Sequence, residues 1–385
     1  MTLFVEDTGL RGVKAATTKI SKVDGQNGIL LYRGYRIEEL ARKSTFEETA
    51  YLLLHGYLPN KEQLEQFSEA VREYRKLPED LGSSLTALSP DTDPMCVLQA
   101  SIPALSAHSP AHGETRDCNM KKAIHIISSM PAIIAGWKRI KCGEEPLKPK
   151  EELSTAANFL YMFNGEVPDD NLARFMDIAM ILHADHTFNA STFAARVVAS
   201  TGANIYAAVS AGVGALSGPL HGGANAQVMR NLIDMNDPDK VEEWVTKQFE
   251  RGKRVAGIGH AVYRTTDPRA TILQEMAYDL LKDHPEFQWY EMTEKMAEVT
   301  QKLFYEKKGK AIYPNVDLYS ASIYHAMGIH HDFFPPVFAM ARAAGWAAHV
   351  IEEKFPNPPV KPVLYRPSSI YVGEDVREYV DISKR

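Results

Sequence analysis

The sequence predicts a mainly α-helical fold with minor β pieces near its two ends. Apolar residues recur at helical spacing along most of the chain, and the alternation of strands and helices typical of a parallel α/β sheet is absent from the pattern. Two short β-like runs lie at 29–32 and 369–373. We therefore expect packed helices with small β elements, not a doubly wound sheet.

The clearest predicted helices begin at residue 46. In segment 46–54 the apolar residues fall at positions i, i+4, i+7 and i+8, and in segment 64–71 they fall at the similar helical positions i, i+3, i+6 and i+7. Pro59 and Asn60 stand between the two segments, where a new helix would start. Both segments are therefore predicted as amphipathic helices.

Segment 203–218 is rich in Ala, Ser and Gly and is followed by Pro219. Because small side chains let helices approach closely, this segment suits a helix buried between other helices or between subunits. Gly, Pro and turn residues mark further breaks at 146–149, 167–170, 217–219, 236–238 and 355–362.

The size and charge of the chain limit its classes of partner. It has 385 residues, 45% of them hydrophobic, which is enough for two domains with real cores. Its formal net charge is −6 at pH 7, so it has no overall basic field to attract nucleic acid or an anionic membrane. Neither partner is expected, and any anionic ligand must meet local cations.

The cysteines and the N-terminal segment indicate a soluble cytoplasmic protein. Cys96, Cys118 and Cys142 are too few and too dispersed for a disulfide framework or a zinc site. Charged residues interrupt segment 1–20, so no signal peptide is expected. The most apolar later stretch, 203–216, is shorter than the roughly 18 residues of a spanning helix.

Three segments place ionisable residues beside Gly or Pro: 218–225, 257–264 and 313–317. Each alone has a structural explanation, because a histidine beside glycine can cap a helix and Pro-Asn-x-Asp is ordinary turn chemistry. Together they supply a set that fits proton abstraction beside a carbonyl group. The residues concerned are His221, His260 and Asp317, with Arg264 and Arg269 close in sequence to the second.

Other chemistries lack their sequence signatures. Gly212-x-Gly214 is followed by Ser217 where a dinucleotide-binding motif requires Gly or Ala, and no strand precedes it. The chain contains no P-loop string and no GxSxG nucleophile elbow. Nucleotide-dependent and serine-hydrolase classes are therefore not expected.

A metal site is also not expected. His183 and His186 could share one helix face, but HExxH is absent and no third ligand motif stands nearby. Segment 330–332, His-His-Asp, is interpreted as a polar loop before an apolar run.

The chain resembles the citrate synthase family over nearly its whole length. The strongest matches are GPLHGGAN at 218–225, GIGHAVYRTTDPRA at 257–270 and YPNVD at 313–317, in the order found in the family. Weaker similarity extends from 32–35 to 371–373. The resemblance implies a two-domain helical fold and a transferase that makes citrate and CoA from acetyl-CoA, oxaloacetate and water, the entry step of the tricarboxylic acid cycle.

The resemblance also implies roles for individual residues. Asp317 matches the base that deprotonates the acetyl methyl group, and His221 matches the donor to the thioester oxygen. His260 matches the histidine that polarises the keto group of oxaloacetate and protonates the new alkoxide. The implied oxaloacetate-binding residues are His186, Arg269, Arg342 and, across a dimer interface, Arg366. The implied CoA-binding residues are Val255, Ala256, Gly257, Ile258, Gly259, Arg264, Lys308 and Lys310.

The family architecture divides the chain into a large domain, 1–222 plus 323–385, and a small domain, 223–322. The large domain would form a homodimer, and the small domain would bind CoA, carry two of the catalytic residues and close over oxaloacetate. Acetyl-CoA is a substrate in this scheme, and no cofactor or metal is implied.

Three other functions stay open. A 2-methylcitrate synthase would use propionyl-CoA with the same catalytic residues, and one methylene changes selectivity by only about 1–3 kcal/mol. Segment 186–192 is similar to segments of both kinds of enzyme. A non-catalytic CoA-binding paralogue and a metal-dependent lyase are the remaining alternatives.

Overall fold

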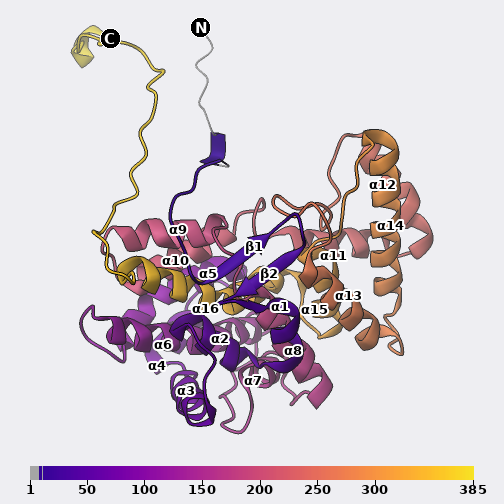
Figure 1. Ribbon diagram of the computed structural model, residues 1–385, viewed down its shortest axis with the longest axis horizontal. Coiled ribbons are helices and arrows are strands. Elements are labelled where there is room, and N and C mark those ends of the chain that lie inside the picture. Colours follow the sequence, from indigo (N-terminus) through magenta and orange to yellow (C-terminus); the bar gives the residue numbers. More distant parts are fainter. Residues whose placement is uncertain (1–7, 11) are drawn as a thin grey trace.

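The computed structural model describes residues 8–10 and 12–385 (Figure 1). Residues 1–7 and 11, which belong to the predicted large domain and to the segment checked for a signal peptide, lie outside the described residues. The helices are, in chain order, η1 (Thr8–Leu10), α1 (Ile37–Lys43), α2 (Phe46–His55), α3 (Lys61–Tyr74), α4 (Glu79–Thr86), α5 (Pro94–Ala104), η2 (Leu105–His108), α6 (Arg116–Lys141), α7 (Thr155–Asn164), α8 (Asp170–His183), α9 (Ala190–Ser200), α10 (Ile205–Leu216), α11 (Ala224–Met235), η3 (Pro238–Lys240), α12 (Val241–Glu250), α13 (Pro268–Leu281), α14 (Gln288–Lys308), α15 (Val316–Ala326), η4 (His331–Phe333), α16 (Phe334–Lys354) and η5 (Ile382–Lys384).

The predicted helices at 46–54 and 64–71 are confirmed as α2 and α3. The side chain of Thr45 accepts a hydrogen bond from the backbone N–H of Glu48 and caps α2. Asn60 and Gln63 form a capping box that starts α3 after the proline break. The predicted Gly and Pro breaks up to 236–238 fall at boundaries between α-helices, and the break at 355–362 follows the end of α16.

A small antiparallel sheet contains β1 (Ser21–Asp24), β2 (Ile29–Tyr32) and β3 (Tyr35–Arg36), in that order. The strand predicted at 29–32 is confirmed, and its partner β1 was not predicted. The strand predicted at 369–373 is wrong, because these residues are exposed and form no ladder with any described residue. A β-strand requires a paired backbone, which a favourable local sequence does not provide.

Helix α16 forms the centre of the core and packs against α6, α9, α10, α2 and α8. It is buried on nearly all sides, as expected for a helix surrounded by other helices. The small-residue segment 203–218 contains α10, which packs against α9, α5 and α16. A Cβ atom added to Gly212 would lie 3.1 Å from the ring of Trp346, so the predicted close helix packing is confirmed.

Helices α11 to α15 contact one another along several faces and lie together on one side of the molecule (Figure 1). Contacts of α13 with α1 and α8, and of α11 with α16, join this group to the remaining helices. The chain after α16 extends away from the helical body (Figure 1), and its side chains are largely exposed. Within the part of the chain described, no helix has the length and apolar character needed to cross a membrane.

Candidate active site

The three Gly- and Pro-rich segments place their ionisable residues in turns and at a helix start. His221 lies in the turn between α10 and α11, His260 in the loop between α12 and α13, and Asp317 in the first turn of α15. The charges of Arg269 and Arg342 both act on Asp317. The structure therefore gathers side chains from distant parts of the sequence into one electrostatic environment.

The loop that carries His260 is tied to the segment that leads to Asp317. The N–H of Gly259 donates to the carbonyl of Tyr313 at 2.8 Å, and the N–H of Asn315 donates to the carbonyl of Gly257 at 2.9 Å. The Asn315 side chain adds a bond to the Gly259 carbonyl at 2.8 Å. These bonds fix the position of the base relative to the histidine loop.

Gly257 has a positive φ of 79° that favours glycine. A Cβ atom added there would lie 2.9 Å from Cα of Leu318. The motif glycine therefore allows the loop to pack directly on the helix of Asp317.

His260 is held as a neutral hydrogen-bond donor. Its Nδ1 accepts from the backbone N–H groups of Val262 and Tyr263 at 3.0 and 3.2 Å. Burial, and then the charge of Arg269, lowers the pKa of His260 to about 4. Because Nδ1 accepts and the ring is neutral, the proton resides on Nε2, which is free to donate to a ligand.

His221 is also neutral but has the opposite tautomer. Its Nε2 accepts from the backbone N–H of Ser191 at 3.2 Å and lies 2.8 Å from the Ser191 hydroxyl. A backbone N–H can only donate, so the ring proton resides on Nδ1. Burial, and then Arg342, lowers the pKa of His221 to about 4. The two histidines thus supply two uncharged donors at neutral pH.

Ser191 was missed by the sequence interpretation. It is fully buried at the start of α9, and its hydroxyl also accepts from Nε1 of Trp346 at 3.1 Å. Ser191 lies in segment 186–192, but that segment does not indicate its role, because its partner His221 lies 30 residues later in the chain.

Asp317 has the properties of a base that works near neutral pH. The side chain of Asp317 is partly buried, and no described residue donates a hydrogen bond to its carboxylate oxygens. Burial raises the pKa of Asp317 to about 6, and the charge of Arg269 opposes this shift. A carboxylate with a raised pKa accepts protons more readily than an exposed one and is still mostly ionised at pH 7.

His186 lies beside His260 although it comes from the turn after α8. The centroids of the two rings are 5.3 Å apart, and Nε2 of His186 is 3.3 Å from the Tyr263 hydroxyl. Burial, followed by the charges of Arg269 and His260, lowers the pKa of His186 well below its ordinary value. His186, which is predicted to bind oxaloacetate, is therefore a second neutral imidazole beside His260.

Arg342 and Arg269 provide buried positive charge. Nε of Arg342 donates to the His183 carbonyl at 2.7 Å, while the buried Nη2 has no partner among the described residues. Arg269 donates to both carboxylate oxygens of Asp267, at 3.0 and 2.7 Å. A buried guanidinium with an unpaired donor is costly unless an anion completes it, so Arg342 is suited to bind a carboxylate.

The remaining predicted binding residues lie on the surface or in the loop before His260. Arg366, Lys308, Lys310 and Arg264 are exposed. In segment 255–259, Ile258 forms a β-bridge with Pro314. Gly257 and Gly259 are bonded to the segment that leads to Asp317, and the charge of Arg264 acts on His260. Contact of segment 255–259 and the basic residues with CoA, and of Arg366 with oxaloacetate, stays a prediction.

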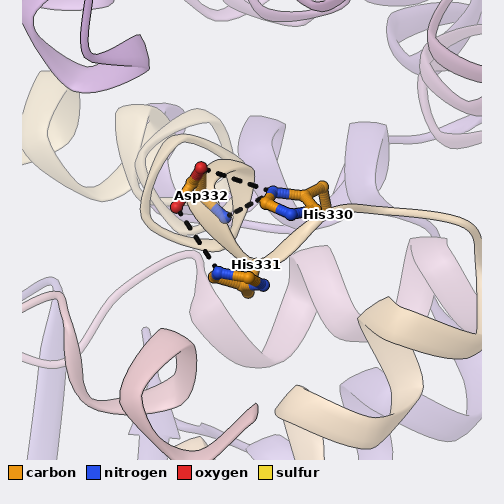
Figure 2. A group of neighbouring side chains, drawn as sticks. All are labelled: His330, His331 and Asp332. Atoms are coloured by element: carbon orange, nitrogen blue, oxygen red, sulfur yellow. Dashed lines mark hydrogen bonds and ion pairs between the residues drawn. The ribbon is translucent and has the colours of Figure 1, made fainter. Parts of the chain in front are cut away.

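One group of potential metal ligands occurs among the described residues, away from the predicted catalytic groups in sequence. Ligand atoms of His330, His331 and Asp332 lie within 4.8 Å of one another (Figure 2). Asp332 pairs with Arg230 at 3.4 Å, and His330 Nδ1 accepts the backbone N–H of Asp332 at 3.4 Å. These contacts fit the predicted polar turn, which forms η4 ahead of α16.

His183 does not combine with His186 in any such group in the described part of the chain. It is fully buried, and its Nδ1 lies 2.7 Å from the Ala179 carbonyl. Its buried Nε2 has no hydrogen-bond partner among the described residues, and burial lowers its pKa to about 3, so His183 is a neutral histidine of the core.

The chain is similar to known proteins over nearly its whole length. A family model described as "Citrate synthase, C-terminal domain" matches residues 9–368. The chain is 43% identical to a citrate synthase of Haloferax volcanii over 383 residues, covering 98% of each protein. It is 38% identical to 2-methylcitrate synthase 1 of Corynebacterium glutamicum, again covering 98% of each. The solved ternary complex of Thermoplasma acidophilum citrate synthase with carboxymethyl coenzyme A and oxaloacetate is similar with a TM-score of 0.92 and 33% identity, over 98% of this chain and 99% of that chain.

Proposed function

This chain belongs to the citrate synthase family, and on that premise we propose how its residues carry out the reaction. The protein is an enzyme that condenses acetyl-CoA with oxaloacetate and water to give citrate and CoA. The observation that carries the residue assignment is a half-buried carboxylate, Asp317, in the same environment as two neutral histidine donors and two buried arginines.

The first step is removal of a proton from the methyl carbon of acetyl-CoA by Asp317. The electron pair moves onto the thioester oxygen, which the Nδ1–H of His221 stabilises. An α-proton of a thioester is too weakly acidic for a carboxylate in water, so a donor fixed at the developing charge is required. Ser191 supports this step by holding the tautomer of His221.

The second step joins the enol carbon to the keto carbon of oxaloacetate. The Nε2–H of His260 polarises the keto oxygen and supplies the proton to the alkoxide, with His186 beside it. Arg269 and Arg342 hold the carboxylates. Water then cleaves the thioester of citryl-CoA to release citrate and CoA.

CoA binding is assigned to segment 255–259 together with three basic side chains. The segment leads directly into the His260 loop, so a bound adenine would lie next to the catalytic histidine. The exposed charges of Arg264, Lys308 and Lys310 suit a flexible, polyanionic arm.

The acyl donor is tested by thiol release from acetyl-CoA and propionyl-CoA in the presence of oxaloacetate, with EDTA in the buffer. Release from acetyl-CoA is expected to be faster by about 10-fold or more, because an apolar pocket discriminates one methylene to that extent. A preference for propionyl-CoA would favour the 2-methylcitrate synthase alternative. No release from either substrate would contradict the enzyme and favour a CoA-binding paralogue, and loss of activity in EDTA would indicate a required metal.

The domain division assigned to the chain is 1–222 plus 323–385 for the large domain and 223–322 for the small one. Contacts among α11 to α15 support a separate small domain, with its C-terminal boundary at 322 lying within α15. Closure of the small domain would exclude water from the site. Hydrogen exchange in 223–322 should slow when oxaloacetate binds, and unchanged exchange would count against closure.

A homodimer with Arg366 donated to the partner's site is part of the proposal. Arg366 lies on the exposed segment after α16, which carries uncovered apolar side chains such as Tyr371, Val372 and Val376. A cavity of about 710 Å³ lies at the base of that segment, between residues 15–19 and 351–365. Exposed apolar chain beside an open cavity fits an arm that packs on a second copy.

The protein is further proposed to act in the cytoplasm without a cofactor, membrane or nucleic-acid partner. The net charge of −6 and the three dispersed cysteines support this proposal. Fractionation of cells that express the protein would test the compartment.

A further inference from the structure

We propose that the N-terminal hairpin, defined as residues 21–32, is a positioning element that sets His186 and His260 relative to each other. The inference rests on the proposed function, because these two histidines are assigned to oxaloacetate. The hairpin contains β1, β2 and the turn between them. It contacts both loops that carry the histidines, although those loops lie more than 150 residues further along the chain.

The base of the hairpin holds the turn that carries His186. The hydroxyl of Tyr32 donates to the Asp185 carbonyl at 2.7 Å and accepts from the Asp185 N–H at 3.0 Å. Ser21, the register partner of Tyr32, donates to the Asp185 carboxylate and accepts from the N–H of Thr187 at 3.0 Å. The residues on both sides of His186 are therefore bonded to the hairpin.

This turn is strained without such support. Thr187 has a φ of 48°, in the left-handed region that β-branched residues rarely adopt. Backbone strain of this kind persists only where the surroundings over-determine it, and it is concentrated at functional sites. Besides Ser21, the carboxylate of Asp185 also accepts from the Thr187 N–H at 3.0 Å. Asp185 is fully buried, so its hydrogen bonds to Ser21 and Thr187 are shielded from solvent.

The tip of the hairpin holds the loop that carries His260. The N–H of Arg264 donates to the Gly25 carbonyl at 2.8 Å. A Cβ atom added to Gly25 would overlap the carbonyl oxygen of Val262. The N–H of Val262 donates to His260 Nδ1 and so fixes which nitrogen of His260 faces the ligand. The hairpin therefore contacts Val262, the residue whose N–H orients the ring of His260.

The two ends of the hairpin are connected by a short paired ladder. Strand β1 pairs with β2 from Ser21↔Tyr32 to Asp24↔Ile29. A ladder of this length spans about 13 Å and has little freedom to stretch. It can therefore act as a fixed spacer between the two loops. The 5.3 Å separation of the His186 and His260 rings then depends on contacts of the hairpin with neighbouring residues, and neither histidine makes these contacts itself.

The experiment uses Gly25→Ala in the full chain, with Gly82→Ala in α4 as the matched control. A Cβ atom at Gly82 meets no atom within 4 Å, so this variant should behave as wild type. In Gly25→Ala the KM for oxaloacetate should rise and kcat should fall, giving a loss in kcat/KM of about 10²-fold, since displacement of a catalytic group by about 1 Å has this effect. Binding of free CoA and the melting temperature should change little.

Three results would overturn the inference: wild-type kinetics in folded Gly25→Ala, an equal loss in Gly82→Ala, or loss of CoA binding together with a lower melting temperature. If Gly25→Ala does not fold, Ser21→Ala tests the other end of the hairpin. It removes the hydroxyl's hydrogen bonds to Asp185 and Thr187 and should raise the KM for oxaloacetate by about 10-fold or more, and an unchanged KM would overturn the inference.

Failure of the proposed function is distinguishable from failure of this inference. An inactive wild type would contradict the proposed function alone. In that case the ¹⁵N resonances of His260 still test the hairpin. They should shift in Gly25→Ala and not in Gly82→Ala, and unshifted resonances would overturn the inference.

Discussion

Replacing Asp317 with Asn is expected to lower the rate of CoA release from acetyl-CoA and oxaloacetate by about 10²–10⁴-fold, the usual contribution of a general base. The amide has nearly the same shape but cannot accept the methyl proton. Because no described residue donates to the carboxylate oxygens, the substitution breaks no hydrogen bond of the apo structure. Thiol release under saturating substrates measures the effect.

The stability of Asp317→Asn separates a catalytic role from a structural one. The raised pKa means that folding disfavours the ionised carboxylate, so stability from this group declines as pH rises from the ordinary value of 3.8 to about 6. At pH 7 the neutral Asn should therefore leave the melting temperature unchanged or raise it. Asp283→Asn, at an exposed position, is the control. A folded Asp317→Asn enzyme with near wild-type activity would contradict the assignment of the base.

The second large effect is expected in mixed dimers. Arg366→Ala should bind oxaloacetate poorly, and Asp317→Asn should lack the base, so each homodimer should be nearly inactive. A heterodimer of the two variants should regain about half of the wild-type activity. One of its sites combines an intact Asp317 with Arg366 of the partner subunit, and the other lacks both groups.

Co-expression with two affinity tags yields the heterodimer for the same thiol assay. If Arg366 acted within its own chain, both sites of the heterodimer would be defective and activity would not return. A monomeric wild type in gel filtration at assay concentration would contradict the dimer itself.

The sequence was sufficient for the elements that local patterns determine. Helices α2 and α3 follow from apolar spacing together with the caps Thr45 and Asn60. The motif segments also indicated where turns would place His221 and His260, because glycines permit the backbone conformations required. These features depend on residues close in sequence.

Features that depend on distant partners were not predictable in the same way. The predicted strand at 369–373 had the right composition but no pairing backbone among the described residues. Ser191 and the contact between Gly25 and Val262 carry no local signature, since their partners lie far along the chain. The tautomer of His221 follows from its contact with Ser191, and that of His260 from the N–H groups of Val262 and Tyr263, so both required the structure.

The measurement that tests the account most directly is the dependence of kcat/KM for acetyl-CoA on pH between 5 and 8.5. Asp317 has to be ionised to act, and its pKa is about 6. The histidine donors have to be neutral, and their pKa values are about 4. We expect a plateau above pH 7 and a single acidic break near pH 6, which disappears in Asp317→Asn. A rate that rises as the pH falls, or one that stays constant down to pH 5, would contradict a carboxylate base working with neutral imidazole donors.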